Sequence, residues 1–389
     1  MADTSVKIFH SGQPGAPVLN TDKGSLIALL DAVLVSGFGL RAVDALSVVN
    51  GVATAQISAG HSAVKDATVL VAGADTAALN GEKRVLSTTA STVKFDTTGI
   101  DPQVATGAIT LKVAPLGWEK PFAAGSLAVY RMLDPNSTRS CLRVNDDYTR
   151  VAAVCGYDVM TDVSTGEVSF PNVNVPGQSV DAQGLRWYKS YAPAARPWVV
   201  IGDARGFYFC SSPGRNESLY AIFGFGDIAS NAPNDAYRCA INGSDYDRLD
   251  DAGDFPFCLA YHANGPGYIR GAATGLGGAR PISKWGSLMT GGAGYSGGPA
   301  SGSIAFPNAA DAGLLLSPVF VFQDNGLRGA YRGLMYCQQV VRDVFSTRDR
   351  LVATDGPLAG RSLMAVKAGM QYYAGYSGVV FFDVTGPWS

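Results

Sequence analysis

The hydrophobic pattern of the first 45 residues predicts a short strand and one helix. Residues 6–10 are a mostly apolar strand, and residues 11–17 carry the prolines and glycines of a turn. In residues 23–35 the apolar side chains recur at helical spacing and form one stripe, made of Leu26, Leu29, Leu30, Val33 and Leu34. We therefore predict an amphipathic helix of about three turns here. Thr21 or Asp22 is its expected N-cap, and Gly37 ends it.

Between residues 46 and 114 the pattern changes to short alternating segments separated by turns. Residues 47–57 alternate about Asn50-Gly51, the favoured pair for a two-residue hairpin turn. Further strands are expected at 69–71, 84–87, 92–95 and 107–113. About six short strands of this kind predict a small β-barrel or sandwich. Its ends near Leu46 and Lys112 are expected to lie side by side, as in a module inserted into a host domain.

The rest of the chain, residues 115–389, resumes an aromatic-rich strand pattern. The expected strands are 196–203, 206–210, 219–225, 255–261, 319–322, 362–366 and 379–384. Within this main β domain, residues 263–303 are a Gly-rich stretch with little periodicity. Loops of that length are usually functional or ordered by contact, so we expect this one to meet a neighbouring chain.

The predicted fold class is therefore mainly β. A β-sandwich-like host domain carries one short N-terminal helix and an inserted small β-barrel or sandwich module. Its predicted divisions are 1–45 for the N-terminal arm and helix, 46–114 for the module and 115–389 for the main β domain.

Composition adds two expectations about partners. Charged residues are 16% of the chain and hydrophobic residues 47%, whereas about 25% charged is typical. This balance indicates a surface partly covered by neighbouring subunits, or alternatively a large, well-buried enzyme. The formal net charge is −2 and no basic block occurs, so nucleic acid is not an expected partner.

No apolar run of about 18 residues and no signal-like start are present, so we expect a protein made in the cytosol without membrane insertion.

Candidate chemistry is sparse along the sequence. The three histidines, His10, His61 and His262, lie far apart in different settings, which does not favour a Ser-His-Asp arrangement. The segment 294–299 is similar to the nucleophile motif of trypsin-like proteases, but Tyr295 stands where that family has Asp. The acidic stretch 245–254 lacks the EF-hand spacing and is interpreted as a solvated turn.

No dinucleotide-binding or Walker motif occurs, and none of the six cysteines lies in a CxxC pair. We therefore predict no catalytic residue, no cofactor, no metal site and no enzymatic activity. The cysteines are interpreted as small buried hydrophobic residues in a reducing compartment.

Several short segments resemble virion structural proteins of tailed bacteriophages and prophages of Gram-negative hosts. They are residues 9–17, 29–39, 61–89, 157–162 and 383–388, and the run 61–89 is similar to a small β-domain of phage tail and fibre proteins. The resemblance implies a homo-oligomeric structural subunit of the virion, in the tail or baseplate, assembled in the host cytoplasm. It implies contacts with copies of itself and with other virion proteins, and it brings no catalytic residue to this chain.

Three other functions are left open by the sequence: a receptor- or glycan-binding tail protein, a capsid decoration protein and, less favoured, a hydrolase. Aromatic side chains on exposed loops would support binding of a host surface glycan, because aromatic faces offer apolar contact to sugars. The candidate contact residues for a glycan or a partner are Trp187, Tyr188, Tyr191 and Trp285.

Overall fold

The computed structural model describes residues 3–171, 184–214, 217–244, 267–270, 279–285, 305–323, 326–337, 339–369 and 377–388. The chain is mainly β, with 48% strand and 6% helix. The strands of the described residues form three antiparallel sheets, and one short α-helix is found there, near the N-terminus. The predicted mainly-β class with one short helix is therefore confirmed.

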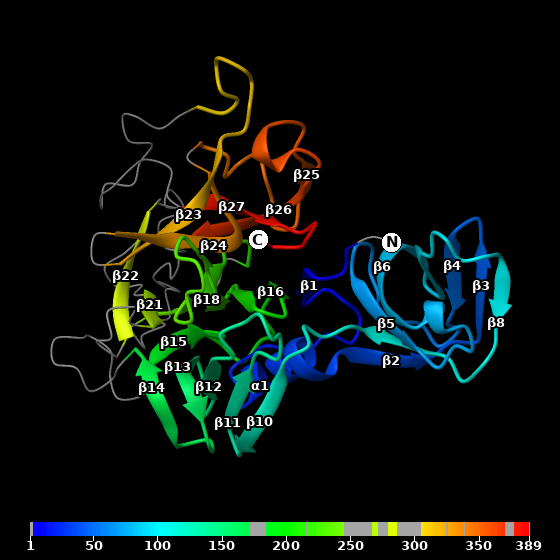
Figure 1. Cartoon of the computed structure of the whole chain (residues 1–389), viewed down its shortest axis with the longest axis horizontal. Helices are drawn as coiled ribbons and strands as arrows, with labels where there is room; N and C mark the ends of the chain where they lie inside the picture. The colour runs from blue at the N-terminus through cyan, green and yellow to red at the C-terminus, as the bar shows by residue number, and fades with distance from the viewer. Residues whose placement is uncertain are drawn as a thin grey trace.

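An eight-stranded sheet stands apart at one end of the molecule (Figure 1). Its order is β2 (Phe38–Ala42), β9 (Thr110–Val113), β5 (Thr68–Ala72), β6 (Gly81–Thr88), β7 (Thr92–Asp96), β4 (Val52–Gln56), β3 (Ala45–Val49) and β8 (Gln103–Ala105). The path begins at β2 and ends at β8, so the sheet is not a closed barrel. Its strands surround a hydrophobic cluster of their own, which includes Leu46, Val69 and Phe95. We call this part, residues 38–113, the module.

The hairpin turn that the sequence predicts in the module is present. Asn50 and Gly51 have φ values of 50° and 72°, which is the left-handed pair that a two-residue hairpin turn between β3 and β4 requires. The strands that enter and leave the module, β2 and β9, pair with each other, with Phe38 opposite Val113 and Ala42 opposite Thr110. The sheet thus begins before the predicted boundary at residue 46, and the division into domains stays a prediction.

The largest sheet of the rest of the chain, which we call the body, has 13 strands. Its order is β1 (Lys7–His10), β16 (Trp198–Asp203), β17 (Gly206–Ser211), β18 (Ala221–Asp227), β20 (Cys239–Asn242), β21 (Gly267–Arg270), β22 (Ala279–Trp285), β23 (Leu316–Gln323), β24 (Gly326–Cys337), β27 (Ser377–Asp383), β26 (Ser362–Gly369) and β25 (Arg350–Val352), with β19 (Ala229–Ser230) beside β24. The second sheet of the body is β10 (Glu119–Ala124), β11 (Leu127–Arg131), β12 (Cys141–Asn145), β13 (Val151–Met160) and β14 (Gly166–Phe170), with β15 (Leu185–Tyr188) beside β13.

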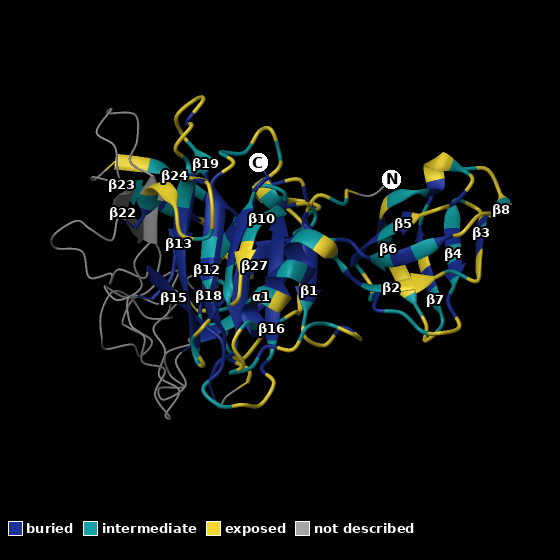
Figure 2. Ribbon diagram, turned by 90° about the horizontal axis from the view of Figure 1, so that it is seen from below, coloured by how far each residue is buried: buried dark blue, intermediate teal, exposed yellow. Residues whose placement is uncertain are grey.

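Strands β16, β17 and β18 are buried along their whole length (Figure 2). One face of these strands packs against the six-stranded sheet and the helix, through residues such as Phe209 and Tyr130. The other face packs against β23, β26 and β27, through residues such as Tyr208 and Phe382. A strand covered on both faces needs apolar residues at successive positions, which explains the continuous apolar run of residues 198–201.

The predicted helix is present, but its N-cap differs from the predicted one. An α-helix, α1 (Ser25–Leu30), continues as the π-helical segment η1 (Asp31–Ser36), and the predicted stripe of five apolar residues is fully buried. The expected cap at Thr21 or Asp22 is wrong, since Gly24 is the N-cap residue and no side chain there caps the helix. The N–H groups of Leu26 and Ile27 instead donate to Asp146, which lies about 120 residues away in the sequence.

The Gly-rich stretch 263–303 is not a single loop. Strands β21 and β22 lie within it and join β20 to β23 in the large sheet. Main-chain pairing of this kind requires no alternating side-chain pattern, which is why the sequence did not indicate it. The remaining residues of the stretch, and the strand expected at 255–261, lie outside the described residues.

Candidate functional site

Two of the four candidate contact residues are buried in the body. Trp187 and Tyr188 on β15 are 0% exposed, so the expectation of exposed loop aromatics is wrong for both. The Trp187 ring packs on Phe209 and Phe223, and its Nε1–H donates to the Asn242 carbonyl oxygen at 2.8 Å. The reason is tertiary: β15 pairs with β13 and faces the large sheet, which covers both rings.

The other two candidates are placed differently. Tyr191 is half-buried, and the guanidinium carbon of Arg196 lies 4.5 Å from the centre of its ring. Trp285 is the last residue of β22 and pairs with Phe320 on β23, so it belongs to a strand rather than a loop. The structure does not bring the four residues into one exposed surface, and a role for Tyr191 or Trp285 in binding stays a prediction.

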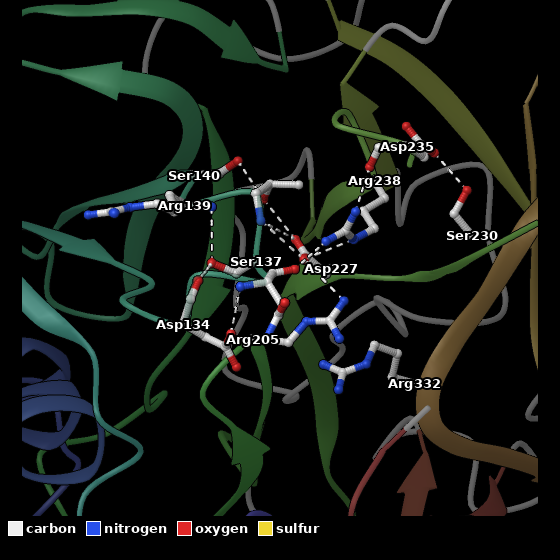
Figure 3. Close-up of polar contacts among 12 residues, drawn as sticks. Asp134, Ser137, Arg139, Ser140, Arg205, Asp227, Ser230, Asp235, Arg238 and Arg332 are labelled. Carbon is white, nitrogen blue, oxygen red and sulfur yellow. Dashed lines mark hydrogen bonds and ion pairs between the residues drawn. The ribbon is translucent and has the colours of Figure 1, made fainter. Parts of the chain in front are cut away.

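Charged side chains inside the body form a network around Asp227, at the end of β18 (Figure 3). The Asp227 carboxylate is buried and accepts hydrogen bonds from the Thr138 hydroxyl at 2.7 Å and from Arg238 Nε at 3.1 Å. Arg205 Nη2 lies 3.6 Å from the same carboxylate. Burial raises the pKa of Asp227, and the hydrogen bond from Thr138 and the two arginines oppose that shift.

Two further aspartates near this network are held by arginine in the same way. Arg332 binds Asp203 through two hydrogen bonds of 3.1 and 2.6 Å, and it also donates to the Trp388 carbonyl oxygen. Arg328 binds Asp235 through two hydrogen bonds of 2.8 and 2.9 Å. Both pairs connect β24 to residues 93 and 129 positions away in the sequence, so we interpret them as contacts that stabilise the large sheet. The adjoining cavity of about 10 Å³ has room for about one water, not for a substrate.

A further buried ion pair holds the helix in place. Lys189 Nζ lies 2.5 Å from Asp146 Oδ1, and both side chains are fully buried. Burial raises the pKa of Asp146 and lowers that of Lys189, while their mutual attraction opposes both shifts. The second carboxylate oxygen of Asp146 receives the helix N–H groups, so the pair joins α1 to the six-stranded sheet.

The cysteines that the structure describes are buried and free: Cys141, Cys155, Cys210, Cys239 and Cys337. Burial raises the pKa of the Cys155 thiol to about 12 and that of Cys337 to about 11. Nucleophilic attack needs the thiolate, so these two positions are unsuited to covalent chemistry at neutral pH.

The N-terminal arm, which belongs to the body, contacts the module through hydrogen bonds and an ion pair. Lys7, on β1, pairs with Glu82 on β6 of the module and donates to the Pro115 carbonyl oxygen. Arg84, also on β6, donates to the Val6 carbonyl oxygen at 2.9 Å and to that of Asp3 at 2.7 Å. The junction is therefore held by charged groups from both parts.

An open cleft of about 440 Å³ lies at this junction and is the main candidate site. One wall is the module segment 64–67, and the other is formed by the arm together with body residues Arg348, Arg350 and Met364. Lys65, Arg348 and Arg350 are exposed. Among the described residues, none of these three cations forms an ion pair with a carboxylate.

His10, on β1, lines the same cleft and contacts Arg348. Arg348 Nη1 lies 3.0 Å from His10 Nδ1 and 3.2 Å from His10 Nε2, so the guanidinium contacts the imidazole directly. Burial, followed by the neighbouring Arg348 and Arg350, lowers the pKa of His10 to about 4. The imidazole is therefore neutral at pH 7 and adds a polar but uncharged group to the cleft.

A second open groove, of about 650 Å³, shares Val64 with the cleft. The arm turn at Gly15, Arg41 of β2 and the segment 59–63 line it. His61 Nε2 lies 2.8 Å from the Thr89 carbonyl oxygen and 3.1 Å from that of Thr92. Both partners are acceptors, so the ring proton sits on Nε2.

Some candidates considered in the sequence lie outside the described residues. These are His262, the acidic stretch from Asp245 to Asp254 and the protease-like segment 294–299. Within the described part of the chain, no group of three or more His, Cys, Asp or Glu side chains is arranged to hold a metal ion. None of the helices described there has the length and apolar character that crossing a membrane requires.

Comparison of the chain with protein-family models and with curated proteins gives no match.

Sequence reasoning did not indicate the cleft residues. His10 and Arg348 are 338 positions apart, and only the tertiary fold brings β1 and the segment before β25 to the same cleft. The one local signal is the Arg348-Asp349-Arg350 triplet, which places two cations close together at the start of a short strand.

Proposed function

We propose that this chain is a non-enzymatic structural subunit of a tailed-phage particle, located in the tail or baseplate. It acts through surfaces buried against copies of itself and against other virion proteins. The proposal is supported first by the short segments that resemble phage virion proteins.

The observation that carries the proposal is where three of those segments meet. Residues 9–17 of the arm and the start of the run 61–89 line the same cleft. Gly386, in the segment 383–388, packs so closely on Asp3 that an added Cβ would lie 2.3 Å from its carboxylate oxygen. Asp3 in turn binds Arg84 of the module. The resembling segments thus build one junction that sets how the module projects from the body (Figure 1).

Sheet edges with exposed apolar side chains offer surfaces for neighbouring chains. Strand β8 ends the module sheet and exposes 72% of Val104, and β25 ends the large sheet and exposes 62% of Val352. An edge strand can pair with another chain through main-chain hydrogen bonds. A ring of subunits would require two different, complementary patches of this kind on each subunit.

Immunogold labelling of intact particles, with antibodies raised against the purified chain, tests the proposal. Gold at the tail or baseplate is the expected result, and particles from a host strain lacking the gene are the control. Gold on the head would favour the capsid decoration alternative, and absence of gold would remove the particle role. A stable monomer in light scattering that also shortens host surface polysaccharide would support a hydrolase instead.

A receptor- or glycan-binding role is the second candidate function. The buried Trp187 and Tyr188 no longer favour it. The specific observation that does is the cation-lined cleft between module and body.

A further inference from the structure

We propose that the cleft between module and body binds an acidic saccharide, with Arg348, Arg350 and Lys65 receiving its carboxylate. Such binding does not depend on where in a particle the chain is located, so the two proposals can fail separately.

The charge of the cleft favours an anion. Lys65, Arg348 and Arg350 face one carboxylate, Asp66, among the charged residues that line the cleft. With His10 neutral, three positive charges and one negative charge leave an excess of two positive charges. The whole chain has a net charge of −2, so this local excess is not a general property of the surface. Arginine also matches a carboxylate with two parallel hydrogen bonds.

The backbone holds Arg348 in place for this role. Its φ is 78°, in the left-handed region that side chains other than glycine rarely adopt. The Arg348 N–H donates to the Ala365 carbonyl oxygen at 2.8 Å, and the guanidinium contacts His10. Among the described residues, the Arg348 guanidinium has no carboxylate partner. Unusual backbone geometry of this kind often occurs where a side chain contacts a ligand.

The rest of the cleft suits a sugar better than a bare ion. Half-buried Val64 lines it beside the cations, and the largely buried Ile8, Ala67 and Met364 also border it, so apolar and charged groups lie within one concave surface. Sugars present both C–H faces and polar groups, and the volume of about 440 Å³ falls in the ~300–1,000 Å³ range typical of small-ligand sites. Nucleic acid is disfavoured because it needs an extended basic track, and the cleft holds three cations.

Isothermal titration calorimetry with the full chain tests the proposal. The probe is digalacturonate, and its neutral dimethyl ester is the matched ligand without charge. We expect saturable binding of the acid and none of the ester, with affinity falling as salt rises. Arg348→Gln and Arg350→Gln should each weaken binding by about tenfold or more. Lys94→Gln, on the exposed surface of β7 outside both grooves, should bind as the unchanged protein does.

A second readout reports the position of the ligand. A carboxylate bound beside Arg348 and Arg350 favours the charged imidazole, so the pKa of His10 should rise from about 4 when digalacturonate binds. NMR titration measures this shift, and His10→Gln assigns the signal. Melting temperatures of all variants check that the fold is retained.

Three results would overturn the proposal. They are equal binding of the acid and the ester, unchanged affinity in both arginine variants, and no binding of digalacturonate at millimolar concentration. A tetraglutamate peptide and inorganic phosphate are the comparison ligands. Binding of the peptide but not the saccharide would assign the cleft to an acidic protein segment, and binding of phosphate alone would assign it to a free anion.

Discussion

Asp146 and Lys189 form an ion pair inside the body, with 2.5 Å between Asp146 Oδ1 and Lys189 Nζ and with both side chains fully buried. The other oxygen of Asp146 accepts hydrogen bonds from the first turn of α1 at 2.7 and 3.1 Å. One carboxylate thus neutralises a buried cation and caps a helix that has no cap of its own. This pair connects the N-terminal helix to the six-stranded sheet.

Replacing Lys189 with Met should lower the free energy of unfolding by about 3–5 kcal/mol, because it leaves the Asp146 carboxylate buried without its partner. Urea denaturation followed by circular dichroism measures the loss. The control is Lys23→Met, which breaks the exposed pair with Asp147 and should cost less than about 1 kcal/mol. Equal losses in the two variants would contradict the structural role assigned to the buried pair.

Trp187 should matter for stability rather than for binding. Truncation to Ala removes a fully buried ring and should cost about 3–5 kcal/mol of unfolding free energy. Trp187→Phe keeps most of the packing but leaves the Asn242 carbonyl oxygen without its donor, which should cost about 1–3 kcal/mol. Thermal denaturation measures both losses. An Ala variant as stable as the unchanged chain would mean that the ring is exposed after all.

Stability should depend on pH through His10. Its pKa is about 4 in the folded chain and about 6.5 in the unfolded chain, so between these values the unfolded chain binds more protons. Stability should therefore fall as the pH is lowered from about 6.5 to about 4, by at most about 3 kcal/mol. Lys65 and Asp66 of the module and Arg348 and Arg350 of the body are the charged groups facing His10 in the cleft.

Urea denaturation at a series of pH values measures this dependence. In His10→Gln the slope of unfolding free energy against pH should be shallower over the same window, because the variant has no group there to protonate. Identical slopes in the two proteins would show that other residues control the acid sensitivity.

The module should be removable. Phe38 and Val113 are direct partners across β2 and β9, so a short Gly-Ser turn can replace residues 39–112 without separating the two ends. We expect the shortened chain to keep a cooperative thermal transition and a β-type circular dichroism spectrum. The segment 37–114 alone should also melt cooperatively, since its hydrophobic cluster is its own. A shortened chain that is unfolded would mean that the body needs the module to fold.

Elements that depend on interactions between near neighbours in the chain could be predicted from the amino-acid sequence. The left-handed preference of Asn50-Gly51 specified a hairpin, and the helical spacing of Leu26 to Leu34 specified a buried stripe, because both signals act over a few residues. The mainly-β class followed from the same local patterns.

Which residues are buried, and which distant residues meet, depends on the packing of the sheets against one another. The sequence around Trp187 is equally compatible with a buried and with an exposed ring. The ring is buried because a second sheet, built from residues distant in the sequence, covers it. Asp146 caps a helix about 120 positions earlier, and His10 meets Arg348 across 338 positions. Such contacts depend on how the sheets stack, and no short-range periodicity in the chain encodes that arrangement.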